Sequence, residues 1–417
     1  MKQILIILVF LLSLNFLYAQ RKVEQKKLFS DYARIENREK VRKELFSNFK
    51  QTFSGEINEA AWIDLFLEAE LMLHKDSLIN YSLIRGFRSY KNRSDKFNRQ
   101  IIETAFALYP QEFSKEVYEI FNSTIDVKVF SAASHYLLRS GYKSSKIILN
   151  VLMNKYPDYG NDSILRFLVR DLENEKTSIP PITDLFSHNF QKNKTIIYSI
   201  HRKDRRFPGL TIIKAPDGEF VRNPDSSIFS IPQLALSATN LPGYMKNGNT
   251  PQGIFSVVGF YISPTKTIGP TPNVLTRIPF EVSTKIFYHN EVETPKWKLE
   301  DYKNLFPVSW QNYLPAMESF YAGKSGRRLI VMHGSVDDLS FYDDEPFFPL
   351  TPTLGCLTTK EIWNEDGTNK KSDQSRLMNA FFSTGELDGF LVVIEIDDKK
   401  EPVTIEEILS FIQQAER

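Results

Sequence analysis

Hydrophobic and polar positions follow a helical period through the first part of the chain. Apolar residues recur at the spacing that places side chains on one face of a helix, as at Ala61, Leu65, Phe66, Ala69 and Leu73. The same pattern predicts further helices over residues 100–107, 114–121, 128–140, 145–155 and 163–173. Short breaks separate these segments, and the segments follow no strict repeat. The first half is therefore predicted to be all-α, as a small bundle or an irregular helical-repeat array.

The pattern changes after the pair Pro180-Pro181, where short runs of β-branched and aromatic residues replace the helical period. Strands are predicted over residues 195–200, 210–214, 219–221, 234–238, 253–260, 329–333 and 390–396. Asp217-Gly218, between the second and third runs, is typical of a hairpin turn. A final amphipathic helix is expected over residues 404–414. The fold class is thus predicted to be α+β and multidomain, with a mainly-β second half.

Residues 1–19 have the pattern of a secretory signal peptide. Lys2 precedes an apolar core over residues 4–17, and Ala19 is the small residue that cleavage needs. The core is shorter than the roughly 20 residues of a bilayer span, which favours cleavage over a membrane anchor. We therefore expect a periplasmic or cell-envelope protein with no stable membrane insertion after cleavage. The remaining chain divides into a helical domain over residues 20–180 and a second domain over 186–417, which the boundary suggests could fold alone.

Without the signal peptide the chain carries no net charge. The whole chain has 52 basic and 51 acidic residues, and the signal peptide removes one lysine and no acid. Proteins that bind nucleic acids usually have a basic excess, so no nucleic-acid partner is expected. The six histidines show no metal-ligand spacing, and neither a metal nor another cofactor is expected.

Cys356 is the only cysteine in the 417 residues. It follows Gly355 in the sequence Thr353-Leu354-Gly355-Cys356-Leu357, and His333 ends a short apolar run 23 residues upstream. A single cysteine in an exported protein is inert packing, an intermolecular link or a working thiol. The Gly-Cys turn and the upstream histidine favour the working thiol.

Two separated motifs resemble the catalytic domain of the L,D-transpeptidase (YkuD-like) family, over roughly residues 193–398. The first is Asn249-Thr250-Pro251-Gln252-Gly253-Ile254-Phe255, which is similar to the family's Thr-Pro-x-Gly-x-Phe turn into a strand. The second is His333-Gly334 followed by Thr353-Leu354-Gly355-Cys356, which is similar to the family's His-Gly and Ser/Thr-x-Gly-Cys pair. The chain resembles a divergent member of this family.

The resemblance implies a β-sandwich with a thioester mechanism, here with a long insert at about residues 261–326. Cys356 would be the nucleophile and His333 its general base. The backbone carbonyl of Gly334 would orient the imidazole, as an acid does in other triads. Backbone N–H groups of Gly355 and Cys356 would form the oxyanion hole.

The chain departs from the family pattern at three points. Leu354 stands where many members have histidine, and Thr358 stands where many have arginine or asparagine. The gap between His333 and Cys356 is also longer than usual. Thr353, Leu354 and Thr358 are the candidate substrate-binding residues, and Thr358 leaves recognition of a substrate carboxylate in question.

Two segments around the motifs have open roles. The insert is rich in aromatic residues, which could form a lid that stacks on sugar rings or a small auxiliary core. The loop between His333 and Cys356 carries acidic residues, which could attract an amine acceptor or could simply be solvated: Asp337, Asp338, Asp343, Asp344 and Glu345.

The expected function is an exported cysteine acyltransferase of the L,D-transpeptidase type. A peptidoglycan tetrapeptide stem would form a thioester with Cys356 and pass to an amine acceptor. A peptidoglycan hydrolase (an L,D-carboxypeptidase or amidase) using the same Cys356 and His333 pair is the first alternative. A non-catalytic cell-wall-binding module is the second. The helical domain is expected to pack or to bind an envelope protein.

Overall fold

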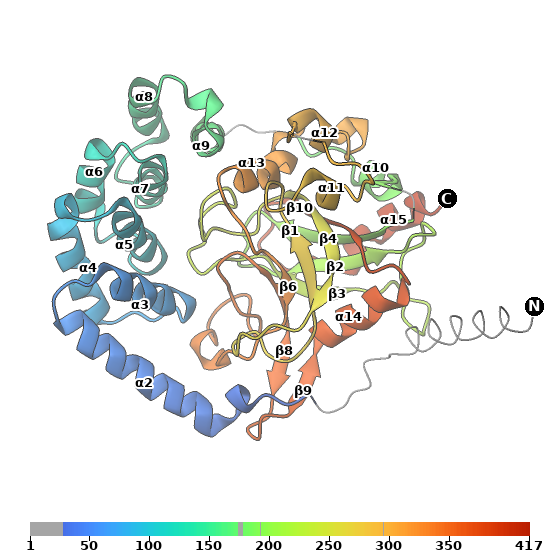
Figure 1. Cartoon of the computed structure of the whole chain (residues 1–417), viewed down its shortest axis with the longest axis horizontal. Helices are drawn as coiled ribbons and strands as arrows, with labels where there is room; N and C mark the ends of the chain where they lie inside the picture. The colour runs from blue at the N-terminus through green and yellow to red at the C-terminus, as the bar shows by residue number, and fades with distance from the viewer. Residues whose placement is uncertain (1–27, 174–177, 192, 295) are drawn as a thin grey trace, which may run out of the picture.

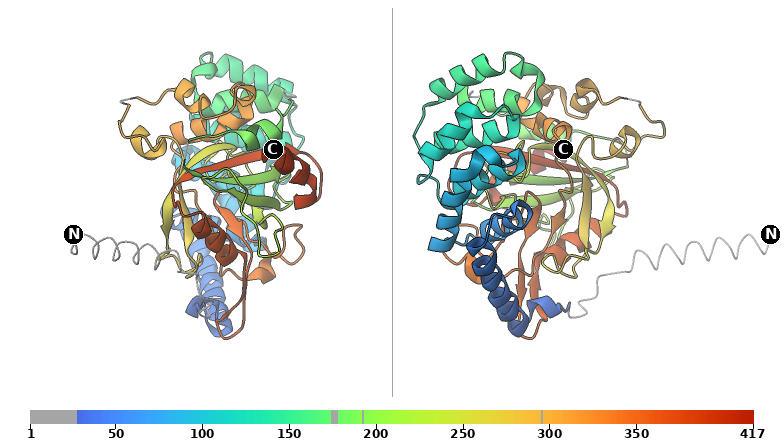
Figure 2. Two further views of the ribbon diagram at one scale, coloured as in Figure 1. Left: turned by 90° about the vertical axis from the view of Figure 1, so that its right-hand side faces the viewer. Right: turned by 60° about the vertical axis from the view of Figure 1, so that its left-hand side comes forward.

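The computed structural model describes residues 28–173, 178–191, 193–294 and 296–417. The predicted signal peptide lies outside these described residues. Figure 1 shows a strand-rich centre with an arc of helices along one side, and Figure 2 shows the same arc from two further directions. No helix of the described ranges is long and apolar enough to cross a membrane.

The first half is helical, as the periodicity predicts. Its helices are α2 (Ile35–Ser54), α3 (Glu59–Leu71), α4 (Ser77–Ser89), α5 (Asp95–Leu108), α6 (Ser114–Ser123), α7 (Val127–Arg139), α8 (Ser145–Lys155) and α9 (Ser163–Glu173), after a short 3₁₀ turn η1 (Asp31–Ala33). Capping side chains fix several starts: Asp76, Ser94 and Asp126 each accept a hydrogen bond from a backbone N–H in the first turn. Along the arc, helices one or two positions apart in sequence pack together, as α3 with α5, α5 with α7 and α6 with α7 (Figure 1).

The second half is built on a closed barrel. Its strands are β1 (Thr195–Arg202), β2 (Gly209–Lys214), β3 (Ile231–Leu234), β4 (Gly253–Tyr261), β5 (Asn273–Arg277), β6 (Met332–His333), β7 (Leu357–Thr359) and β10 (Gly389–Asp397). They close in the order β1-β10-β4-β5-β6-β7-β3-β2. The pairs β1–β10 and β6–β7 are parallel, and the other pairs are antiparallel. A separate hairpin joins β8 (Glu361–Trp363) to β9 (Asn369–Ser372).

The predicted β-sandwich is therefore wrong, because these eight strands form a closed mixed barrel. The closure depends on β6 and β7, which are only two and three residues long. The sequence predicts a strand over residues 329–333, of which only Met332 and His333 pair, and it predicts no strand at β7. The longer strands β1, β4 and β10 lie close to their predicted positions, whereas residues 219–221 make only an isolated bridge between Lys214 and Phe220.

Side chains of the central strands alternate between two buried apolar clusters. Ile197 and Val393 belong to one cluster, and Tyr198 and Val392 belong to the other. Strands buried on both faces read as continuous apolar runs, which explains why β1 and β10 are visible in the sequence. The second of these clusters continues without interruption into the helical half, where it includes Phe167.

The two halves make direct polar contacts as well. The Tyr342 hydroxyl donates to the Leu71 carbonyl at 2.5 Å, and the Tyr244 hydroxyl lies 2.8 Å from Nε2 of His135. Helix α10 (Ile182–Ser187) spans the boundary placed at residue 186, and Lys214 donates to its Phe186 carbonyl at 2.7 Å. The change of pattern near residue 180 marks the end of the helical arc, but the two halves share one core.

The aromatic insert packs into the apolar cluster that the two halves share. Its helices are α11 (Thr284–Phe287), α12 (Leu299–Lys303) and α13 (Glu318–Lys324). Its buried aromatic residues pack on one another and on β4: Phe287, Tyr288, Tyr302, Phe306, Trp310, Tyr313, Phe320 and Tyr321. This arrangement favours the core over the lid. The remaining helices are α14 (Asp373–Ser383) and α15 (Ile405–Ala415).

Candidate active site

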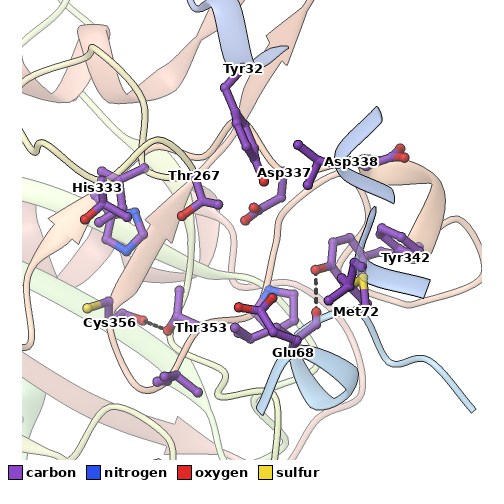
Figure 3. A pocket seen from close by; sticks show the side chains of 18 of the residues that line it. Tyr32, Glu68, Met72, Thr267, His333, Asp337, Asp338, Tyr342, Thr353 and Cys356 are labelled. Carbon is purple, nitrogen blue, oxygen red and sulfur yellow. Dashed lines mark hydrogen bonds between the residues drawn. The ribbon is translucent and has the colours of Figure 1, made fainter. Parts of the chain in front are cut away.

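Strands β6 and β7 bring the two motif residues to one place. The strands are parallel, with Met332 opposite Leu357 and His333 opposite Thr358. Met332 and Leu357 belong to a buried cluster, so His333 points to the opposite face of the sheet. Cys356 lies immediately before β7. Figure 3 shows the Cys356 and His333 side chains together at one side of a cavity.

Gly334 fixes the tautomer of the histidine. Nδ1 of His333 lies 2.5 Å from the Gly334 carbonyl oxygen. A carbonyl only accepts hydrogen bonds, so Nδ1 carries the proton and Nε2 keeps its lone pair. Burial lowers the pKa of His333, while the Gly334 carbonyl raises it. The imidazole is thus neutral at pH 7 and able to take a proton.

The thiol of Cys356 is held in its neutral form. Burial raises its pKa above the ordinary value of 9.0, while the Val331 backbone and the Arg327 guanidinium lower it. The Cys356 Sγ donates to the Leu329 carbonyl at 3.4 Å. Because the thiol and the imidazole are both neutral, the thiol proton must move to His333 while the sulfur attacks the substrate rather than before the attack.

The turn before Cys356 needs glycine. Gly355 has φ of +117°, and a Cβ there would lie 2.0 Å from Nη2 of Arg327. The Gly355 N–H donates to Oγ1 of Thr353 at 2.9 Å, and this hydroxyl donates to the Cys356 carbonyl at 3.0 Å. Thr250 of the first motif donates to the Gly355 carbonyl at 2.9 Å. The two motifs therefore meet at this turn.

The three candidate substrate-binding residues have different positions. Thr353 and Leu354 line the cavity, and Leu354 is exposed there. Thr358 is buried, and its hydroxyl donates to the Thr351 carbonyl at 2.7 Å. The Thr358 side chain is thus engaged with the backbone and does not line the cavity.

Two buried ionisable residues behind the site, Arg327 and Glu361, are not apparent in the sequence. Arg327 is buried and donates to the carbonyls of Gly243, Gly248 and Asn249, which places its charge behind the Gly355-Cys356 turn. Glu361 lies under Gly334, where a Cβ would come within 2.3 Å of its carboxylate. Both residues are three or more positions from a motif, and only their burial distinguishes them from surface charges.

The cavity is formed by both halves of the chain. Its volume is about 510 Å³, and it is lined on one side by Cys356 and His333. Figure 3 shows Tyr32, Glu68 and Met72 of the helical half on the other side. The loop from His333 to Cys356 spans the two sides, because its Tyr342 contacts Leu71 and its Asp338 lies 3.6 Å from Arg42. The long loop between His333 and Cys356 therefore makes contacts with the helical half.

Of the acidic residues in this loop, Asp337 and Asp338 line the cavity. Burial, with Glu68 and Asp338 nearby, raises the pKa of Asp337 to about 6, although the Ser335 hydroxyl acts against this. Among the described parts of the chain, no three ligand-type side chains gather in a way that could hold a metal ion.

Comparison of the chain with protein-family models, with curated proteins and with solved structures finds no match.

The raised thiol pKa predicts the pH dependence of alkylation. The thiolate is the reactive form, so a pKa above 9.0 leaves less than about 1% thiolate at pH 7. We expect the rate of Cys356 alkylation by iodoacetamide to rise with pH to beyond pH 9. Replacing Arg327 by methionine removes a cation that lowers the pKa of Cys356, so the rise in rate should move to higher pH. A plateau near neutral pH would show instead that the thiolate forms in the resting protein.

Proposed function

We propose that the chain is an exported cysteine acyltransferase of the L,D-transpeptidase type that acts on peptidoglycan stem peptides. The observation that carries the proposal is the His333 side chain, with Nδ1 on the Gly334 carbonyl, in one cavity with the only cysteine. The barrel differs from the sandwich that the resemblance implies, so the proposal depends on the site and the motifs. Export and localisation in the periplasm or cell envelope remain predictions from residues 1–19.

The first half-reaction forms a thioester. Cys356 Sγ attacks the carbonyl at the L-centre of diaminopimelate in a tetrapeptide stem, and Nε2 of His333 takes the thiol proton. We assign the oxyanion to the Cys356 N–H, because the Gly355 N–H already donates to Thr353. The C–N bond then breaks, and His333 returns the proton to the departing amine of D-alanine.

The second half-reaction transfers the acyl group. An amine attacks the thioester carbonyl, His333 takes a proton from it, and the C–S bond breaks to release Cys356 as a thiol. If water attacks instead, the same residues produce a hydrolase. The nature of the acceptor decides between the two, and both use the same catalytic pair.

The test is incubation of the protein lacking residues 1–19 with defined disaccharide-tetrapeptides, followed by mass spectrometry of the products. Crosslinked dimers with release of D-alanine support transpeptidation. Loss of D-alanine alone supports the hydrolase. A binding module would return the muropeptides unchanged.

A further inference from the structure

The cavity beside Cys356 contains an arginine, Arg38, whose Nε meets no hydrogen-bond acceptor among the described residues. Three arginines and three acids line it: Arg38, Arg42, Arg328, Glu68, Asp337 and Asp338. Arg42 is already engaged, because it lies 3.6 Å from Asp338 and 4.5 Å from the ring centre of Phe341. Arg328 is exposed to solvent at the cavity rim.

Arg38 differs from both of these arginines. It lies on α2 with Nε shielded from solvent, and no hydrogen-bond acceptor meets this atom among the described residues. No described carboxylate lies within ion-pair distance of its side chain. A shielded donor on a charged group is costly unless a partner satisfies it. The planar guanidinium fits a carboxylate, which can accept two parallel hydrogen bonds.

The position two residues after Cys356, which the resemblance associates with substrate recognition, does not offer a side chain that could bind a carboxylate in the cavity. The resemblance places an arginine or asparagine two residues after the nucleophile, where this chain has Thr358. The Thr358 hydroxyl donates to the Thr351 carbonyl at 2.7 Å, and its side chain does not line the cavity. A carboxylate-bearing substrate therefore needs a cationic partner from another part of the chain.

We propose that Arg38 binds a carboxylate of the substrate whose carbonyl Cys356 attacks. The helical half then supplies a specificity-determining residue for the acyl-transfer site. This inference rests on the proposed function, because it takes Cys356 as the nucleophile. It also gives the helical arc a role in recognition beyond packing and beyond binding an envelope protein.

The charge balance of the cavity makes this inference testable. Three arginines and three acids line the cavity, so its lining has no excess of positive residues that would attract every anion. A preference for a carboxylate must then come from a local contact. Such a preference should depend on the length of the ligand and on Arg38 in particular.

The test uses maleimides that react with Cys356, which needs no knowledge of the natural substrate. Each probe carries a terminal carboxylate on a methylene spacer, from maleimidoacetate to maleimidohexanoate, and is compared with its uncharged primary amide. The ratio of the two alkylation rates reports the preference for the carboxylate. We expect a ratio of about tenfold at one spacer length, as for a charge-assisted hydrogen bond, and a ratio near one in Arg38→Met.

Matched variants separate this contact from general charge effects. Arg88→Met removes an exposed arginine of α4, which does not line the cavity, and should leave the ratio unchanged. Arg38→Lys keeps the charge but loses the planar fork, and should lower the ratio in part. Circular dichroism checks that each variant folds.

The outcomes distinguish the inference from the function on which it rests. Fast alkylation without a carboxylate preference, or a preference lost only in Arg328→Met, would overturn the assignment to Arg38 and leave the nucleophile in place. No alkylation of the folded wild-type protein by any amide probe would contradict the proposed function, and the inference with it.

Discussion

Replacing Cys356 by alanine is expected to abolish conversion of muropeptides while the protein remains folded. Removing a nucleophile typically costs on the order of 10⁴-fold or more in rate, because no other group forms the covalent intermediate. The Cys356 Sγ makes one polar contact, with the Leu329 carbonyl at 3.4 Å, so the loss of stability should be about 1 kcal/mol or less. Product analysis gives the rate, and urea unfolding gives the stability.

A control variant distinguishes loss of the thiol from disruption of the turn that holds it. Thr353→Val removes the hydroxyl that binds the Gly355 N–H and the Cys356 carbonyl but leaves the nucleophile in place. It should reduce the rate while leaving Cys356 open to alkylation. If the alanine variant keeps wild-type activity, the acyl-enzyme mechanism is wrong.

Removing the helical half is expected to unfold the barrel. A fragment of residues 178–417 keeps α10 but loses the helices that continue its apolar cluster, including Phe167. The loss would expose Tyr244 and Tyr321, which now contact Phe167, and would leave the Tyr342 hydroxyl without the Leu71 carbonyl. Exposed apolar area of this kind promotes aggregation and loss of tertiary structure. Near-ultraviolet circular dichroism and gel filtration of the fragment measure both.

Complementation provides the control for the fragment. Co-expression of residues 20–180 as a separate chain should restore a soluble complex with a reactive Cys356. A fragment that is monomeric by itself, unfolds cooperatively and keeps wild-type thiol reactivity would contradict a shared core. It would support the independent second domain that the change of pattern near Pro180-Pro181 suggests.

Local patterns explain which parts of the fold could be predicted from the sequence. The helices of the first half have apolar faces three and four residues apart, and β1 and β10 are apolar runs buried on both faces. The closed barrel could not be predicted, because β6 and β7 contribute five residues between them and closure depends on their pairing. Pairing between distant short segments leaves no local pattern.

At the site, too, local motifs can be predicted from the sequence, whereas contacts between distant segments cannot. Cys356, His333 and Gly334 belong to short motifs. The structure places Cys356 and His333 beside one cavity, with the Gly334 carbonyl against Nδ1 of His333. Arg38 and Glu68 line that cavity from segments more than 250 residues away, and no periodicity connects them to Cys356. Arg327 is similar, because its role depends on the three carbonyls around its guanidinium. The sequence predicts Cys356 and His333 and nearby lining residues such as Thr353 and Leu354, but not the residues of the helical half that line the same cavity.

The most direct test of the central claim is the reaction of the protein with a carbapenem, followed by intact-protein and peptide mass spectrometry. Carbapenem-type β-lactams acylate the cysteine in the family that the motifs resemble. If His333 activates Cys356, one adduct should form on the peptide that contains Cys356, and it should form about 10² to 10⁴ times more slowly in His333→Ala. No adduct at any pH, or equal rates in the two proteins, would contradict a cysteine nucleophile activated by His333.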